Sequence, residues 1–228
     1  MLVATGAKTV TIRELATRAR NGRSLRGLVA ITFDDGFVSV VTHALPLLTE
    51  RDLVGTVFCV AGHLGRTNDW PTQPAGAQRS PLAGGAELRE LAGAGFEVGA
   101  HGMEHAPLVA STERELEREL VESRRVLEDE VGASVTSVAY PYGAPPRPSA
   151  RALVEATYAA GCTTRITRVA PGTDPYSLPR IDAHYVRRPA VLRAVVEGRL
   201  DAYLTLRRRL AHVRRLVRSD YTGAGTPG

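Results

Sequence analysis

Cysteine, aromatic residues and long apolar runs are all scarce in this sequence. Only two cysteines occur in 228 residues. Cys59 and Cys162 each lie in an apolar run, so we expect reduced core residues rather than a disulfide. No apolar run approaches the roughly 18 residues that span a membrane. The N-terminus lacks the basic start and long apolar stretch of a secretory signal. These absences predict a cytoplasmic protein.

The composition is that of a folded chain with an uneven distribution of charge. Hydrophobic residues make up 43% and charged residues 23%, which suits a sizeable core and argues against global disorder. Residues 187–218 hold 10 arginines and two acidic residues, a net charge of +8. Because the whole chain carries +5, the remaining residues carry a net charge of −3. We therefore distinguish a body, residues 1–188, from a basic segment, residues 189–228, which we expect to be helical and packed on the body.

Strand-like and helix-like patterns alternate along the body, without an internal repeat. Apolar runs predict strands over residues 27–33, 55–61, 96–100, 135–140 and 162–166, with a sixth candidate over 178–181. Amphipathic patterns predict helices over residues 11–22, 38–51, 87–92, 112–131 and 149–160. This alternation indicates parallel βαβ units in an α/β fold, either an open sheet or a barrel. In both architectures the loops after the strands share one face.

The first predicted strand ends in two acids and a glycine. Asp34 and Asp35 follow the apolar run directly, and adjacent carboxylates repel each other unless a cation or a proton relieves them. Gly36 permits a turn that other residues resist. The alternative is a solvated turn, because Asp-Asp-Gly is also typical turn composition.

A second group of candidate ligands follows the third predicted strand. His101 and His105 are four residues apart and can meet one metal in a helix or a tight turn. With one carboxylate they would make an open-sided site for Zn²⁺ or another first-row dication. The other carboxylate could act as a general base on metal-bound water. Gly102, rather than glutamate, follows His101, which argues against the zinc-protease helix motif. Capping or hydrogen bonding in a turn is the alternative for the histidines.

Taken together, these motifs resemble the polysaccharide deacetylase family, the NodB-homology group of carbohydrate esterase family 4. The matching segments are Thr32-Phe33-Asp34-Asp35-Gly36, His101-Gly102-Met103-Glu104-His105 and Tyr140-Pro141-Tyr142-Gly143. The similarity covers about residues 28–181. The resemblance implies a distorted, incomplete (β/α) barrel with fewer than eight parallel strands, and makes residues 1–188 the catalytic domain.

The resemblance also implies roles for individual residues. Asp34 would be the catalytic base, and the backbone N–H of Tyr142 would help to bind the oxyanion. The metal ligands would be Asp35, His101 and His105. The expected metal is Zn²⁺, with Co²⁺, Ni²⁺ and Mn²⁺ as alternatives.

Further residues are candidates for substrate contact. Pro141 and Tyr142 belong to the third motif, and His63 follows the second predicted strand at the same rim. Trp70 lies on a long loop, where it could stack on a sugar ring or simply pack against the protein. His63 has the same alternative of a structural role.

The sequence departs from the family pattern at three places. Ala139 occupies a position where many relatives carry an arginine directed at the catalytic aspartate, and Arg180 is the replacement we expect. The alternative for Arg180 is a surface ion pair. His184 is the nearest candidate for the general acid, with an ordinary surface histidine as its alternative. No strand is evident before the first predicted helix, so we expect the barrel to be open there.

The basic segment has an apolar stripe opposite its arginines. The stripe consists of Leu206, Leu210, Val213 and Val217. One interpretation is a helix packed on the body, and a second is contact with an anionic lipid or membrane surface, or with a lipid-phosphate-linked substrate. Nucleic acid is a third, which the lack of interleaved aromatic residues disfavours.

The sequence therefore predicts a metal-dependent hydrolase that removes an N-acetyl group from an amino sugar or N-acetylated glycoconjugate, with metal-bound water as the nucleophile. One alternative is a metal hydrolase of another C–N bond, in a cyclic imide or ureide, on the same scaffold. A second is a non-catalytic carbohydrate-binding relative, which the complete first motif argues against.

Overall fold

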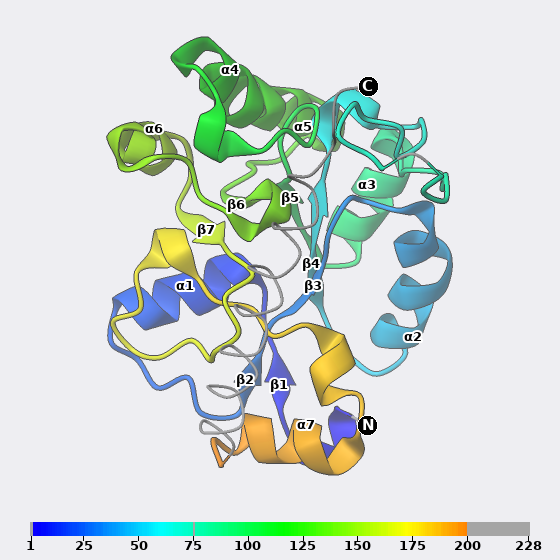
Figure 1. Ribbon diagram of the computed structural model, residues 1–228. Helices are drawn as coiled ribbons and strands as arrows, with labels where there is room; N and C mark the ends of the chain where they lie inside the picture. Colours follow the sequence, from blue (N-terminus) through cyan, green and yellow to red (C-terminus); the bar gives the residue numbers. More distant parts are fainter. Residues whose placement is uncertain (1, 75, 200–228) are drawn as a thin grey trace, which may run out of the picture.

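A curved sheet of five parallel strands forms the centre of the molecule (Figure 1). The computed structural model describes residues 2–74 and 76–199. The strands, which neighbour one another in chain order, are β3 (Ile31–Phe33), β4 (Gly55–Cys59), β5 (Glu97–Ala100), β6 (Ser137–Ala139) and β7 (Ala160–Cys162). The sheet curls into a half-barrel, which confirms the predicted incomplete barrel of fewer than eight parallel strands.

Helices connect the strands and cover the sheet. They are α1 (Ile12–Arg20), α2 (Leu45–Thr49), α3 (Gly85–Gly93), α4 (Glu113–Glu117), α5 (Ser123–Val131), α6 (Arg151–Thr157) and α7 (Pro189–Val196). None of these described helices is long and apolar enough to cross a membrane.

Alternate residues of the strands pack into two separate clusters, as the two-residue period of a strand requires. Val57 and Val98 join the main core with leucines of α3, α4 and α5, including Leu88. Phe58 points the other way and packs with Ile12 and other residues of α1. Helix α1 therefore packs on the opposite face of the sheet from α3, α4 and α5. The two cysteines, Cys59 and Cys162, are free and buried, and burial raises the pKa of each thiol to about 12.

The two edges of the half-barrel, at β3 and at β7, differ from the sequence prediction. The predicted strand over residues 27–33 is two strands, because β2 (Leu28–Val29) pairs with β1 (Lys8–Thr9) in a separate parallel sheet, whereas β3 joins the main sheet. The expectation of no strand before the first helix was therefore wrong. Strand β1 is two residues long, too short for a periodic pattern. The sixth candidate strand makes one isolated bridge, between Cys162 and Leu178.

The helix predicted over residues 112–131 contains a change of helical type. Helix α4 begins at a capping box, in which the Thr112 hydroxyl accepts from the N–H of Glu115 and the Glu115 carboxylate accepts from the N–H of Thr112. A π-helical stretch, Arg118–Glu122, then joins α4 to α5. Such stretches often occur near functional sites, and this one directs Glu119 into the interior, where it is 4% exposed.

Part of the basic segment lies within the described chain. Helix α7 packs Val195 against Ile166, with Ile181 and Tyr185 beside them. Residues 200–228, which carry the predicted apolar stripe, lie outside the described residues. The division of the chain at residue 188 and the lipid contact stay predictions.

A buried carboxylate joins the sheet to α1. Glu97 accepts hydrogen bonds from the Ser137 hydroxyl at 2.7 Å, from the Thr56 hydroxyl at 3.1 Å and from the backbone N–H of Arg13 at 2.9 Å. The Thr56 hydroxyl in turn accepts from the N–H of Ile12 at 3.0 Å. Two of the free N–H groups of α1 are thus satisfied by strand residues rather than by water.

Replacing Glu97 should destabilise the protein strongly. In Glu97→Ala the Ser137 hydroxyl and the Arg13 N–H lose their acceptor inside the protein, so we expect the free energy of unfolding to fall by at least about 2 kcal/mol. Urea unfolding measures the change. The matched control is Glu90→Ala on the exposed side of α3, where the loss should stay within about 0.5 kcal/mol. Equal losses in the two variants would contradict this account of Glu97.

Candidate active site

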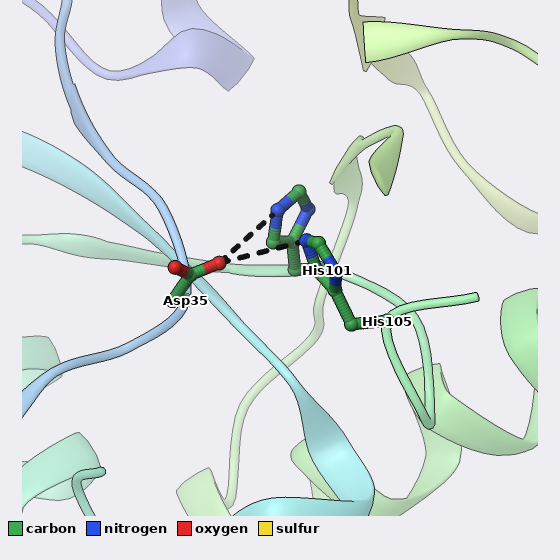
Figure 2. A group of neighbouring side chains, drawn as sticks. All are labelled: Asp35, His101 and His105. Atoms are coloured by element: carbon green, nitrogen blue, oxygen red, sulfur yellow. Dashed lines mark ion pairs between the residues drawn. The ribbon is translucent and has the colours of Figure 1, made fainter. Parts of the chain in front are cut away.

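Three polar side chains from two strand ends meet at one rim of the half-barrel (Figure 2). Asp35 follows β3, and His101 and His105 lie on the turn after β5. One oxygen of Asp35 lies 3.5 Å from Nε2 of His101 and 3.7 Å from Nε2 of His105. The potential ligand atoms all lie within 4.8 Å of one another. The carboxyl ends of parallel strands thus bring these distant residues together, as the βαβ pattern predicts.

The backbone around these ligands is held in an uncommon conformation. Asp35 has φ 69° and His105 has φ 53°, both in the left-handed region. For residues other than glycine this conformation costs on the order of 1 kcal/mol or more and is concentrated at functional sites. Gly102, between the two histidines, has φ 83°, and a Cβ there would lie 2.5 Å from a carboxylate oxygen of Glu119. The turn therefore needs glycine for both its shape and its space.

The tautomer of His101 follows from its hydrogen bond. His101 is 3% exposed, and its Nδ1 lies 2.7 Å from the backbone carbonyl of Ala139. A carbonyl only accepts, so Nδ1 carries a proton, and in the neutral form of the ring Nε2 presents its lone pair to the site. Ligating histidines are commonly oriented in this way.

His105 is held differently. Burial, together with the nearby His101, lowers the pKa of His105 to about 3, so its ring is neutral at physiological pH. The imidazole packs against aromatic neighbours, with ring centroids 4.6 Å from Trp70 and 4.8 Å from Tyr142. Its Nδ1 is buried and has no hydrogen-bond partner within the described part of the chain.

The donor set fits a divalent first-row metal. One carboxylate and two imidazoles are the oxygen and nitrogen ligands that Zn²⁺ and its neighbours accept, and three protein ligands leave a side open. Among the residues that the structure describes, no other group of three ligating side chains lies close enough to hold an ion. Asp35, His101 and His105 could therefore hold a metal.

The neighbouring carboxylate is paired with an arginine. Arg180 Nη1 lies 2.5 Å from one oxygen of Asp34, and Nη2 lies 2.8 Å from the other. The Arg180 side chain is 14% exposed and that of Asp34 is 37% exposed, so the guanidinium is mostly buried while the carboxylate stays open to the site. Its Nε also donates to the carbonyl of Thr163 at 3.2 Å. The guanidinium therefore holds both oxygens of Asp34 in one orientation.

The two aspartates differ in their tendency to ionise. Burial opposes ionisation of Asp34, but the hydrogen bonds from Arg180 and the charges of His101 and Arg180 outweigh it, so the pKa of Asp34 lies below its usual value. Burial raises the pKa of Asp35; the charge of Asp34 adds to this rise, and His101 only partly opposes it. A cation beside Asp35 would reverse that rise.

The remaining predicted residues lie at or beyond the edge of this group. Tyr142 follows Pro141, has φ 60° and is 51% exposed at the rim. His63 and Trp70 are 5% and 3% exposed, which leaves little surface on either for a sugar. His184 is exposed, its N–H donates to Asp182, and its ring faces Tyr185, so its side chain does not join the others.

Sequence reasoning missed Glu119. Its carboxylate accepts from the backbone N–H of Met103 at 2.8 Å and of Glu104 at 3.1 Å, and so supports the turn between the two histidines. Burial raises the pKa of Glu119, although the N–H groups of Glu104, Met103 and Ala106 act in the opposite direction. The available signal was its place beside the apolar stripe of the helix, where a carboxylate needs a reason to be buried.

Comparisons with known proteins agree on one family. The profile of the family described as polysaccharide deacetylase matches residues 21–161. A poly-beta-1,6-N-acetyl-D-glucosamine N-deacetylase of Staphylococcus aureus (strain MRSA252) is 25% identical over 184 residues, which are 77% of this chain and 61% of that protein. The chain spans about three fifths of the length of the curated relatives it matches.

Solved structures share the fold. The structure of IcaB from Ammonifex degensii superposes with a TM-score of 0.71 and 25% identity, over 86% of this chain and 84% of that chain. Streptococcus pyogenes deacetylase PplD, in complex with acetate, gives a TM-score of 0.64 and 21% identity, over 77% and 74% of the two chains. The resemblance first seen in the motifs is thereby confirmed.

Glu119→Gln should weaken metal binding. The amide keeps the size of the side chain but replaces one acceptor with a donor that faces backbone N–H groups, so the turn that carries His105 loses support. We expect the affinity for Zn²⁺, measured in competition with a chromophoric chelator, to fall about 10-fold. Glu122→Gln, exposed on the same helical stretch, is the control and should bind Zn²⁺ like the original protein. An unchanged affinity in Glu119→Gln would show that the turn does not need this carboxylate.

Proposed function

Because this chain belongs to the polysaccharide deacetylase family, we propose that it is a metal-dependent hydrolase that removes N-acetyl groups from an amino sugar or an N-acetylated glycoconjugate. The observation that carries the proposal is the pairing of a three-ligand set, Asp35, His101 and His105, with a separate ionised carboxylate, Asp34, beside it. The N-acetyl-D-glucosamine polymer named for the Staphylococcus aureus relative supports the substrate class.

The proposed reaction needs a Lewis acid, and the ligand set would hold one. A divalent metal bound there would polarise the acetyl carbonyl and acidify a water molecule. His101 is suited to this task because its Nε2 lone pair already faces Asp35. His105 is suited because its ring stays neutral across the physiological range, and neutral imidazole is the ligating form.

Asp34 is the proposed base that takes a proton from the attacking water. Its lowered pKa keeps it ionised at neutral pH, at some loss of basicity. Arg180 holds both of its oxygens, so the carboxylate is oriented before substrate arrives. The guanidinium of Arg180 therefore orients the proposed base, Asp34, for proton transfer.

The rim beside the ligands supplies the proposed oxyanion contact. Tyr142 lies in a left-handed turn after β6, and a fixed backbone N–H there could donate to charge that develops on the acetyl oxygen. The exposed Tyr142 ring and the adjacent Pro141 would contact the sugar. His184, the sequence candidate for the general acid, lies outside this group, and we assign no step to it.

The first test is acetate release. We expect the zinc-loaded protein to release acetate from at least one member of a panel of N-acetylated sugars and glycoconjugates. The metal-stripped protein should be inactive, and Asp34→Asn should lose at least about 100-fold in rate while it still binds Zn²⁺. An enzymatic acetate assay with parallel metal analysis measures both properties.

The outcomes separate the proposal from its rivals. Hydrolysis of cyclic imides or ureides without acetate would favour another C–N hydrolase on the same scaffold. Binding of the sugars with full function in Asp34→Asn would favour a non-catalytic carbohydrate-binding protein. Absence of metal binding in the unmodified protein would remove the basis of the proposal.

A second prediction concerns the arginine. Arg180→Met removes both hydrogen bonds to Asp34, so we expect the rate of acetate release to fall about 10-fold or more while Zn²⁺ affinity is kept. Arg180→Lys should recover only part of the rate, because an ammonium does not hold both oxygens in the same way. The control is Arg89→Met, on the exposed side of α3. A rate in Arg180→Met equal to that of the control would contradict the role of Arg180.

A further inference from the structure

The two imidazoles of the ligand set are oriented by different means. His101 donates its second ring nitrogen to the carbonyl of Ala139, which lies at the end of a core strand. The second ring nitrogen of His105 is buried, and no atom of the described chain forms a hydrogen bond with it. Ligating histidines almost always have such a partner, because it sets the direction of the ring. Something else must therefore orient His105.

The indole of Trp70 is the broadest surface in contact with that ring. The two rings lie 4.6 Å apart between centroids at an interplanar angle of 30°, close to an offset stack. Tyr142 and His101 meet His105 only edge-on, at interplanar angles of 67° and 69°. Trp70 is therefore the neighbour that restricts rotation of the imidazole plane.

Trp70 is itself held firmly, although its indole nitrogen has no hydrogen-bond partner among the described residues. It is 3% exposed and packs with Val60 and Leu82. It forms a T-shaped pair with His63, with ring centroids 5.8 Å apart, and His63 Nε2 lies 2.9 Å from the carboxylate of Glu104. The N–H of a buried tryptophan usually has a hydrogen-bond acceptor. Here both Trp70 and His105 are held by packing instead of by a hydrogen bond from the buried ring nitrogen.

The loop that carries Trp70 also holds the backbone of His105. The Thr72 hydroxyl donates to the carbonyl of His105 at 3.3 Å, and the Tyr142 hydroxyl donates to the Thr72 hydroxyl at 2.7 Å. Residues of the connection between β4 and α3 therefore contact His105 at its ring and at its main chain, next to its left-handed backbone angle.

We propose that Trp70 is a positioning residue that orients His105 for metal binding, through a buried ring stack in place of the usual hydrogen bond. The inference rests on the proposed function, because it requires that His105 binds a metal. It differs from stacking on a sugar, for which the indole has almost no exposed surface. Trp70 acts through His105 and is not assigned any contact with substrate.

The stack also predicts a spectroscopic signal. Trp70 is the only tryptophan of the chain, so the whole indole fluorescence of the protein comes from a ring in contact with a proposed ligand. Paramagnetic Co²⁺ bound at Asp35, His101 and His105 should quench this emission in a saturable way, and a chelator should restore it.

The experiment compares Trp70→Phe and Trp70→Leu with the unmodified protein. Zn²⁺ affinity is measured by chelator competition, and KM for acetate release is measured at saturating Zn²⁺. We expect Trp70→Leu to lower Zn²⁺ affinity about 10-fold or more and Trp70→Phe, which keeps an aromatic face, to lower it less. KM should stay within about twofold of the original value. Leu127→Ala, a fully buried core residue outside this stack, controls for a general loss of stability.

Several results would overturn the inference. If Trp70→Leu binds Zn²⁺ as tightly as the original protein, the stack does not position His105, and a raised KM in that variant would assign Trp70 to the sugar instead. If Leu127→Ala weakens Zn²⁺ binding equally, the effect reflects stability alone. If Trp70→Leu does not fold, the Zn²⁺ affinity of Trp70→Phe decides the matter, and an unchanged affinity in that variant would overturn the inference. An unmodified protein that binds neither metal would refute the proposed function as well.

Discussion

The burial of two adjacent carboxylates at the end of β3 is the constraint on which the rest of the site depends. Burial opposes the ionisation of both Asp34 and Asp35, and a positive charge or hydrogen-bond donors nearby favour it. The fold separates them by giving each a different partner. Arg180 holds Asp34 through two hydrogen bonds, whereas Asp35 faces two imidazoles and has a raised pKa. A divalent cation on the second side would complete the compensation, which is the strongest physical reason to expect one.

The incomplete barrel allows Asp34 to have a partner different from that of Asp35. Arg180 reaches Asp34 from 146 residues further along the chain, in the segment after Leu178, which makes a single bridge to β7. Within the described residues, β3 and β7 are the two edges of the sheet and do not pair with each other. Arg180 also donates to the carbonyl of Thr163, just after β7. One guanidinium therefore bridges residues that follow the two edge strands, Asp34 after β3 and Thr163 after β7.

The sequence could predict the site residues that directly follow an apolar run, because such a run indicates a buried strand and so gives their position in the fold. Asp34 and Asp35 end an apolar run, and the two histidines end another, so parallel strands alone bring them to one rim. Strand β1 was missed because two residues carry no periodicity. Glu119 was missed because a π-helical stretch turns it inward, and its partners are backbone N–H groups, which no residue pattern reveals.

Trp70 illustrates a different limit of sequence reasoning. Its loop position suits a sugar platform or an internal contact equally well, and only the path of the loop decides between them. In the structure the loop folds back onto the turn of His105, and the indole is buried. The burial of a loop side chain depends on contacts between segments far apart in sequence, so composition and periodicity could not settle it.

The two histidines of the site are held by different kinds of contact, a backbone carbonyl for His101 and loop side chains for His105. His101 is anchored to the backbone of a core strand, and a backbone carbonyl is present whatever the side chains are. His105 is held by side chains of the β4–α3 loop, Trp70 at its ring and Thr72 at its carbonyl. Thr72 of that loop also accepts from Tyr142, the exposed aromatic residue at the rim. Tyr142 and the carbonyl of His105 are therefore linked through one hydroxyl, that of Thr72, so the exposed rim and the turn of His105 share a hydrogen-bond chain.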